Sequence, residues 1–255
     1  MTTRNSTRLS DSDAMYRGTV WRLIQLVVYP CFRLLLRIRV KGAQRLDEGT
    51  GGLLLINHQS FLDPIVLGLG LRRPVSFLAR DSLFRVFLLG WILKKTHVLP
   101  INRRLGSVSS IRMAVNRIKS GCLVGLFPEG TRTSDGQVGE FKSGFIALLR
   151  RVQSPVYPVG IAGAFQAMPR GGVLPKFGKI RVVYGAPIAY ETFQPFLAKG
   201  QEYQLVNILR QQVLECQRQA EEWRDGGSKT DNNDRTLETS QVPAPGETPR
   251  VKSDR

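Results

Sequence analysis

Short apolar runs that alternate with amphipathic stretches constrain the fold of this chain more than any other feature. The run Gly52–Ile56 is typical of a buried strand, and a helical pattern through Phe61, Ile65 and Leu69 follows it. The same alternation continues across residues 37–189. Strands that alternate with helical stretches are typical of parallel sheets, because each parallel strand needs a crossover connection. The sequence therefore predicts an α/β fold, a single domain with a largely parallel central sheet flanked by helices.

The expected elements follow from these patterns. Strands are expected at residues 37–41, 52–56, 75–79, 97–101, 122–127, 156–161 and 180–184. Helices are expected at residues 61–71, 84–94, 107–120, 141–152 and 191–224. The stretch 84–93 is apolar nearly all round, which indicates that most of this helix is buried in the core.

Size and charge limit the class of protein. A chain of 255 residues that is 42% hydrophobic can bury one good-sized core. A formal net charge of +17 calls for an anionic partner, either nucleic acid, an anionic membrane surface or a phosphorylated ligand. The three cysteines, Cys31, Cys122 and Cys216, are odd in number and widely spaced. This pattern indicates no disulfide framework and no zinc site, and it favours a reducing compartment.

The N-terminal part of the chain combines apolar and basic residues. Residues 1–14 are polar and are expected to be flexible. In residues 15–39 the longest uncharged run has ten residues, whereas a bilayer-spanning helix needs about 20. Up to residue 45, nine Lys and Arg stand against two Asp, a net charge of +7. We expect 15–39 to be an amphipathic helical segment on a membrane surface, with an N-terminal helix packed on the core as the alternative.

The remaining boundaries follow from composition. Residues 40–224 carry the strand and helix patterns and are expected to form the folded domain. In residues 225–255 the composition changes to Gly, Ser, Asn, Asp, Thr and Pro with few apolar residues, which predicts a disordered tail.

The stretch that follows the strand 52–56 carries a possible acid–base pair. It contains one of the two histidines of the chain, His58, and Asp63 follows five residues later. If the turn folds the carboxylate back onto the imidazole, His58 can act as a general base near neutral pH. The alternative interpretation is structural, since Ser60 and Asp63 also have the spacing of a helix capping box.

Two further strand ends carry cationic residues. Arg103 follows one expected strand, and the run from Phe127 to Arg132 follows another. Arginines at the same edge of the sheet suit a phosphate, because the guanidinium offers forked donors to its oxygens. Glu129 can orient an arginine or accept from a substrate hydroxyl, and Gly130 permits close approach of the backbone. Taken singly, each arginine is more often a solvated surface charge.

Together these stretches resemble the four ordered blocks of the glycerolipid acyltransferase family. The blocks are Asn57-His58 with Asp63, then Arg103, then Phe127-Pro128-Glu129-Gly130-Thr131-Arg132, then Val156-Tyr157-Pro158. The resemblance covers roughly residues 40–190, so 40–224 would be the acyltransferase domain. The second block departs from the family, because a bulky apolar residue is common where Pro100 or Ile101 stands and only Arg103 is clearly matched.

The resemblance implies a role for each matched residue. His58 would be the general base on the acceptor hydroxyl, and Asp63 would hold its tautomer. The acceptor oxygen would attack an acyl thioester directly, without an acyl-enzyme. The phosphate of the acceptor would be bound by Arg103, Glu129, Gly130, Thr131 and Arg132. The acyl or acceptor pocket would include Asn57 and Pro158. Backbone amides near the start of the first helix are candidate oxyanion donors.

The implied reaction transfers a fatty acyl group from acyl-CoA or acyl-ACP to the sn-2 hydroxyl of 1-acyl-glycerol-3-phosphate (lysophosphatidic acid). The expected partners are this donor, this acceptor and an anionic membrane surface, with no nucleic acid. The expected location is the cytoplasmic face of a membrane, as a peripheral or monotopic protein. No cofactor and no metal is implied.

Other functions remain open at this point. The acceptor could instead be glycerol-3-phosphate, another lysophospholipid or a lyso-aminolipid. A basic nucleic-acid- or anionic-membrane-binding protein without catalysis would share the charge, although no zinc-finger, RRM or KH signature is present. A serine hydrolase would need a G-x-S-x-G elbow, which the sequence lacks.

Overall fold

The structure is a computed structural model, and it describes residue 26 and residues 30–46, 50–71, 75–80, 84–85, 98–101, 107–172 and 174–226. Several sequence-based predictions lie outside these residues. They are the flexible N-terminus, most of the membrane-surface segment before residue 30, the helix at 84–94 beyond residue 85, Arg103, and the tail beyond residue 226.

Seven strands form one sheet, as the alternation of patterns predicts. They are β1 (Arg39–Lys41), β2 (Gly52–Ile56), β3 (Val75–Arg80), β4 (Leu99–Ile101), β5 (Leu123–Leu126), β6 (Val156–Ala162) and β7 (Arg181–Tyr184). The strand order is β1-β7-β6-β2-β5-β3-β4. Neighbouring strands are parallel throughout except for β6 and β7, which pair antiparallel. The mixed, mostly parallel sheet confirms the α/β fold.

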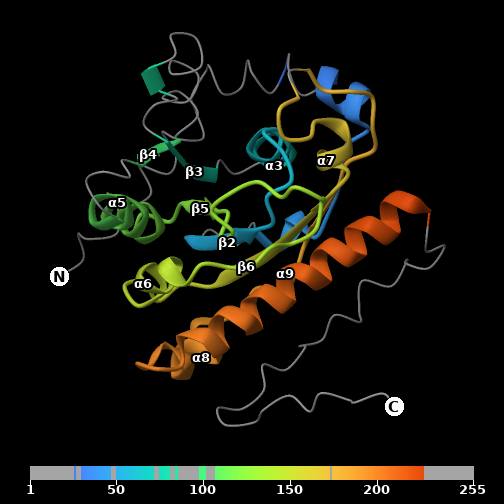
Figure 1. The fold of residues 1–255 in the computed structure, drawn as a ribbon. Helices are drawn as coiled ribbons and strands as arrows, with labels where there is room; N and C mark the ends of the chain where they lie inside the picture. The colour runs from blue at the N-terminus through green and yellow to red at the C-terminus, as the bar shows by residue number, and fades with distance from the viewer. Residues whose placement is uncertain are drawn as a thin grey trace, which may run out of the picture.

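Helices cover both faces of this sheet (Figure 1). The α-helices are α3 (Asp63–Gly70), α5 (Ser107–Lys119), α6 (Ile146–Leu149), α7 (Ala164–Ala167), α8 (Tyr190–Phe193) and α9 (Glu202–Asp225). Short 3-10 turns occupy Ala43–Leu46, Ser143–Phe145 and Gln194–Leu197, and residues 30–36 are helical.

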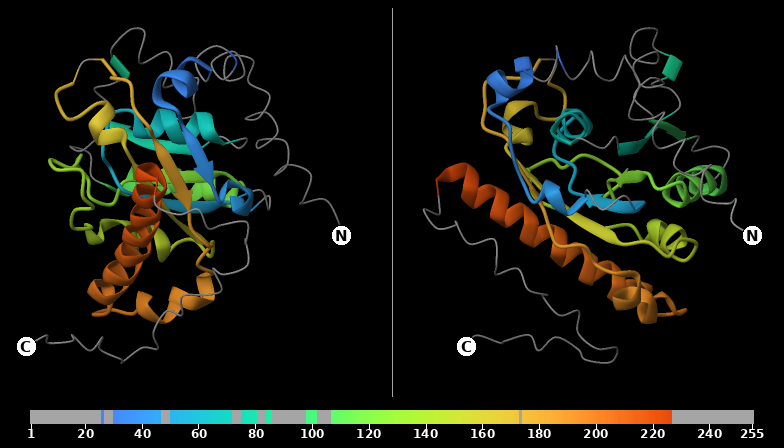
Figure 2. Two further views of the ribbon diagram at one scale, coloured as in Figure 1. Left: turned by 90° about the vertical axis from the view of Figure 1, so that its right-hand side faces the viewer. Right: turned by 180° about the vertical axis from the view of Figure 1, so that it is seen from behind.

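Strand β2 lies at the centre of the molecule and contributes to two core clusters. Leu53 and Leu55 face a cluster built with α5, α6 and α9, whereas Leu54 and Ile56 face a cluster built with α3, α7 and residue 36. Side chains of a strand alternate between the faces of the sheet, so an apolar run must be covered on both sides. Figure 2 shows the resulting three layers, with the sheet between the two groups of helices.

The structure corrects two of the expected helices. The helix expected at 191–224 is divided into α8, a 3-10 turn and α9. Pro195 lies at the start of that turn and lacks the N–H that an uninterrupted helix would need, and Gly200 then adopts a left-handed conformation with φ of 91°. The helix expected at 141–152 is reduced to a 3-10 turn followed by α6. The short helix α7 is missing from the sequence-based expectation.

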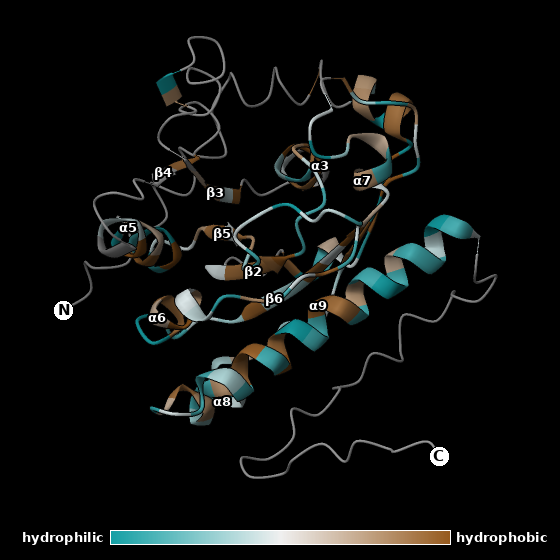
Figure 3. Cartoon of the chain, in the orientation of Figure 1, coloured by the Kyte–Doolittle hydropathy of each residue, from teal (hydrophilic) through white to brown (hydrophobic). Residues whose placement is uncertain are grey.

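Helix α9 packs along β6 and β7 through one apolar stripe (Figure 3). The buried members repeat at helical spacing and are Leu205, Val206, Leu209, Val213, Cys216, Gln217 and Ala220. The closest approach is at Gly160 of β6, where a Cβ atom would lie 2.1 Å from the backbone of Cys216 and Gln217. Only glycine allows the helix to lie this near the strand.

The N-terminal boundary of the folded core differs from the one expected at residue 40. Leu36 and Ile38 are buried in the same cluster as α3. The amides of Gly178 and Ile180 donate to the carbonyls of Leu35 and Leu36, which joins this end of the segment to the rest of the chain. The alternative of packing on the core therefore holds for residues 35–38. Among the described residues, no helix is both long and apolar enough to cross a bilayer.

Replacing Gly160 with Ala should destabilise the protein, because backbone atoms of α9 would have to move away from β6. We expect the free energy of unfolding in urea to fall by at least about 2 kcal/mol. Gly144→Ala is the matched control, since a Cβ there meets nothing within 4 Å. Equal unfolding midpoints for the two variants would contradict the close approach of α9.

Candidate active site

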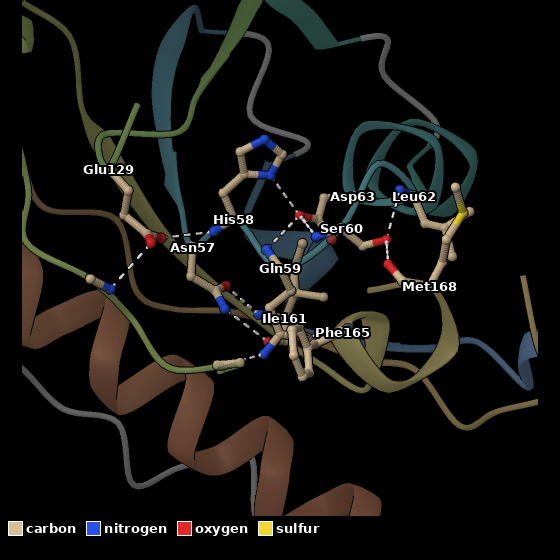
Figure 4. A network of polar contacts seen from close by, with 12 residues as sticks. Asn57, His58, Gln59, Ser60, Leu62, Asp63, Glu129, Ile161, Phe165 and Met168 are labelled. Carbon is tan, nitrogen blue, oxygen red and sulfur yellow. Dashed lines mark hydrogen bonds and ion pairs between the residues drawn. The ribbon is translucent and has the colours of Figure 1, made fainter. Parts of the chain in front are cut away.

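The imidazole of His58 and the carboxylate of Asp63 form a hydrogen-bonded pair where β2 ends. The distance from His58 Nδ1 to Asp63 Oδ2 is 2.8 Å. The side chain of His58 is 20% exposed, whereas that of Asp63 is fully buried. Figure 4 shows the second ring nitrogen of His58 on the side away from Asp63. The turn thus folds the carboxylate back onto the ring, as the spacing of the two residues predicts.

Three N–H groups converge on one oxygen of Asp63. Besides His58 Nδ1, the backbone amides of Gln59 and Ser60 donate to Oδ2 at 2.7 and 2.8 Å. Burial raises the pKa of the Asp63 carboxyl, and these three hydrogen bonds oppose that shift by stabilising the charged form. Asp63 begins α3 and accepts from the amide of Ser60, but the N-cap residue is Leu62 and it makes no side-chain capping bond, so the capping-box interpretation is not confirmed.

Two further amides at the start of α3 are also engaged. Leu62 N donates to the Ser60 hydroxyl, and Asp63 N donates to the Ser60 carbonyl. The expectation that amides near the helix start serve as oxyanion donors is therefore not supported for Gln59, Ser60, Leu62 and Asp63. The Ser60 hydroxyl donates to the carbonyl of Met168 at 2.7 Å, which gives it a structural partner far along the chain.

The loop 127–133, which follows β5, holds the backbone of His58 from both directions. The amide of His58 donates to Glu129 Oε1 at 2.8 Å, and the amide of Thr133 donates to the carbonyl of His58 at 2.8 Å. The second carboxylate oxygen of Glu129 accepts from the amide of Gly139 at 3.1 Å. Burial raises the pKa of the Glu129 carboxyl. The two carboxylate oxygens of Glu129 thus connect the backbone of His58 to that of Gly139.

The ring of His58 is stacked on the ring of Phe127, with centroids 4.1 Å apart and an interplanar angle of 21°. Phe127 in turn stacks on Phe77 at 5.9 Å. The sequence-based reasoning did not assign Phe127 this role. The available signal was its place at the end of β5, which pairs directly with β2.

The loop 127–133 also carries Arg132, and Lys142 approaches it at Gly130. The guanidinium of Arg132 lies 5.4 Å above the ring of Phe61, at the start of the helix that follows His58. Gly130 has φ of 70°, and a Cβ there would lie 3.1 Å from the Lys142 ammonium, so glycine allows the lysine to approach. Thr131 is exposed. Lys142 is a cation that the sequence-based reasoning missed, and Arg103 lies outside the described residues.

Asn57 and Pro158, which are expected to line the acyl or acceptor pocket, both make hydrogen bonds to the backbone of other segments. Asn57 is buried, and its side-chain amide exchanges two hydrogen bonds with the backbone of Ile161, at 2.9 and 2.7 Å. Pro158 lies within β6, where its carbonyl accepts from the amide of Gly185. The contacts of Asn57 join the end of β2 to β6, and the contact of Pro158 joins β6 to the residue that follows β7.

A glutamine network connects α9 to the same turn. The side-chain amides of Gln59 and Gln217 both donate to the carbonyl of Gly136, each at 2.8 Å. Gly136 is held in turn by the Thr133 hydroxyl, which accepts from its amide at 3.1 Å. Sequence patterns did not point to Gln217, because a single polar residue on a helix stripe carries no signal for its distant partner.

The described part of the chain holds no cluster of His, Cys, Asp and Glu that could bind a metal ion. The chemistry that the arrangement supports is proton transfer at the second ring nitrogen of His58, which points away from Asp63.

Comparison with known proteins gives consistent matches. Residues 37–162 match the family model described as Acyltransferase. A chloroplastic 1-acyl-sn-glycerol-3-phosphate acyltransferase (LPAT1) of Arabidopsis thaliana is 31% identical over 63% of this chain and 45% of its own length. A 1-acyl-sn-glycerol-3-phosphate acyltransferase of Bacillus subtilis is 29% identical over 71% of this chain and 88% of its own length.

The fold has a match among solved structures as well. The crystal structure of the 1-acyl-sn-glycerophosphate acyltransferase PlsC from Thermotoga maritima aligns with a TM-score of 0.64 and 24% identity, covering 84% of this chain and 83% of that one. This likeness supports the fold, and the sequence matches support the family. The chain belongs to the acyltransferase family.

Proposed function

We propose that the protein transfers a fatty acyl group from an acyl thioester to the sn-2 hydroxyl of 1-acyl-glycerol-3-phosphate, giving phosphatidic acid. The observation that carries the proposal is the pair of His58 and Asp63 at the sheet edge. The cations Arg132 and Lys142 belong to the stretch that follows β5, which adjoins His58. The names of the relatives in Arabidopsis and Bacillus favour this acceptor over other lysolipids.

The proton transfers follow from the contacts of His58. An ionised Asp63 can only accept, so Nδ1 carries a proton and Nε2 is free to take one. Nε2 removes the proton of the acceptor hydroxyl as its oxygen attacks the carbonyl carbon of the thioester. The C–S bond breaks when the tetrahedral intermediate collapses, and the thiolate leaves with the proton held by the imidazolium. Asp63 stabilises the imidazolium between these two steps.

The second part of the proposal concerns the phosphate of the acceptor. Arg132 and Lys142 would bind it, with Arg103 as a further candidate from the sequence. Arginine binds phosphate oxygens through forked donors and lysine acts as a point charge, so the two side chains complement each other. Glu129 would act as a positioning residue for His58, through the contact with the His58 amide.

The third part concerns where the reaction takes place. Both substrates carry long acyl chains in the proposed reaction, so we propose that the protein works at the surface of an anionic membrane. Acyl-CoA and acyl-ACP both present phosphopantetheine and negative charge, and the basic chain suits either donor.

Replacing His58 with Ala should abolish acyl transfer, because no other group takes the hydroxyl proton. We expect kcat to fall by about 10²–10⁴-fold. The assay supplies lysophosphatidic acid and a long-chain acyl thioester and follows free thiol and phosphatidic acid, which should appear in equal amounts with the unchanged protein. His97→Ala, at the other histidine of the sequence, is the control. A folded His58→Ala protein with near-full turnover would exclude His58 as the base.

Replacing Arg132 with Ala should weaken binding of the acceptor more than binding of the acyl donor. Loss of a charge-assisted contact to phosphate should raise KM for lysophosphatidic acid by about tenfold or more, with KM for the thioester unchanged. Arg151→Ala is the matched control, because the guanidinium of this exposed arginine donates to a backbone carbonyl one helical turn earlier. If both variants change KM for the acceptor equally, Arg132 does not bind the phosphate.

Replacing Glu129 with Ala should lower kcat and stability together. The amides of His58 and Gly139 would lose their acceptors in a buried site, which costs about 1–3 kcal/mol of unfolding free energy. KM for the acceptor should change little, and Glu129→Gln, which keeps an acceptor oxygen, should recover part of kcat. A change confined to KM would instead indicate that Glu129 contacts the substrate.

A further inference from the structure

Large apolar side chains on two segments outside the candidate active site are exposed to solvent. Leu174 is 77% exposed and Phe177 is 84% exposed, both in the segment 168–179 that follows α7. Leu34, on the helical residues 30–36, is 80% exposed. Soluble proteins commonly expose single apolar residues, whereas a contiguous patch marks an interaction surface. The arrangement of these three side chains therefore decides between the two interpretations.

The fold places the two segments side by side. The amide of Gly178 donates to the carbonyl of Leu35 at 3.3 Å, and the amide of Ile180 donates to the carbonyl of Leu36 at 2.9 Å. In Figures 1 and 2 the segment after α7 runs beside the blue helix of residues 30–36 in every view. Residues more than 130 positions apart in the sequence therefore contribute to one surface, which we call the apolar–basic face and define as Leu34, Arg170, Leu174, Lys176 and Phe177.

The charge around these side chains has one sign. Arg170, Lys176 and Lys179 are exposed on the second segment, and Arg37 is exposed after the first. Neither residues 30–46 nor residues 164–181 contain Asp or Glu. Asp225 at the end of α9 lies near Lys179, and its pKa is lowered mainly by the hydrogen bond from Arg224 and to a smaller extent by Lys179. Exposed apolar groups among cations, without acids between them, are suited to an anionic membrane. The cations contact the charged headgroups and the apolar groups enter the hydrocarbon layer.

We infer that the apolar–basic face docks on an anionic phospholipid bilayer, with Leu174 and Phe177 entering the interface and Arg170 and Lys176 contacting lipid phosphates. The segment 168–179 is thus a second membrane contact besides the N-terminal segment, and the pattern of the sequence alone did not point to it.

The face adjoins the turn that carries His58. The Ser60 hydroxyl bonds to the carbonyl of Met168, where the segment 168–179 begins. At the start of α3, Phe61 and Ile65 are partly exposed, and Arg132 lies over Phe61. A lipid acceptor held at the docked face would have its headgroup beside Arg132 without leaving the interface. This last step rests on the proposed function, whereas the docking itself does not.

The test is the full-length double variant Leu174→Ser/Phe177→Ser, sedimented with vesicles of phosphatidylcholine and phosphatidylglycerol. Both side chains are solvent-exposed, so the variant should unfold at the same temperature as the unchanged protein. Its partition coefficient should fall by about tenfold or more, because two large apolar groups no longer enter the interface. Tyr203→Ser is the matched control, since Tyr203 is 77% exposed on α9 and should leave binding unchanged.

A second variant tests the charge. Arg170→Gln/Lys176→Gln should weaken binding to the mixed vesicles and leave binding to pure phosphatidylcholine unchanged. In addition, the Trp emission that Phe177→Trp adds should shift to shorter wavelength with the mixed vesicles. Unchanged sedimentation of the double serine variant overturns the inference. So does a loss of self-association in that variant without a loss of vesicle binding, because a second copy of the chain would then cover the face.

Activity measurements separate this inference from the proposed function. With a short-chain, water-soluble lysophosphatidic acid, the double serine variant should turn over as fast as the unchanged protein. With acceptor embedded in vesicles it should be about tenfold slower or more, in line with its weaker partition. If the unchanged protein acylates neither acceptor, the proposed function fails while the sedimentation result stands on its own.

Discussion

The turn after β2 depends on the parallel pairing of β2 with β5 on one side and with β6 on the other. Parallel strands end at the same edge, so the pairing brings residues 57–63 beside the loop after β5 and the backbone of Ile161. Glu129, Thr133 and Ile161 then bond to the backbone of His58 or to the side chain of Asn57. Asp63 then orients the ring of His58 and also holds the amides of Gln59 and Ser60 in the same turn.

Sequence patterns predict the structural features that are formed by residues close together in the chain. The strand β2 has the expected bounds, since a run of five apolar residues between glycine and a polar turn admits no other assignment. The contact between His58 and Asp63 is also local, because five residues separate the two side chains and a tight turn must return one to the other. The phosphate-binding role of Arg132 stays a prediction, and the structure places this side chain over the ring of Phe61.

The parts that patterns miss involve partners far apart in the chain. Glu129 has an obvious charge, yet its partners are two backbone amides that no sequence pattern marks. Asn57 and Pro158 belong to short motifs, although their contacts hold two strands together. The division of the helix expected at 191–224 follows from Pro195 and Gly200. A prediction from hydrophobic periodicity alone does not account for their tendency to end a helix.

The shared carbonyl of Gly136 has a consequence for how the protein is made. Gln59 belongs to the first third of the chain and Gln217 to the last described helix, and both bond to the same oxygen. A nascent chain therefore cannot complete the surroundings of His58 until residue 217 has left the ribosome and α9 has closed over Gly160. A chain without α9 lacks the bond from Gln217 to Gly136, so the turn after β2 loses its connection to the last described helix.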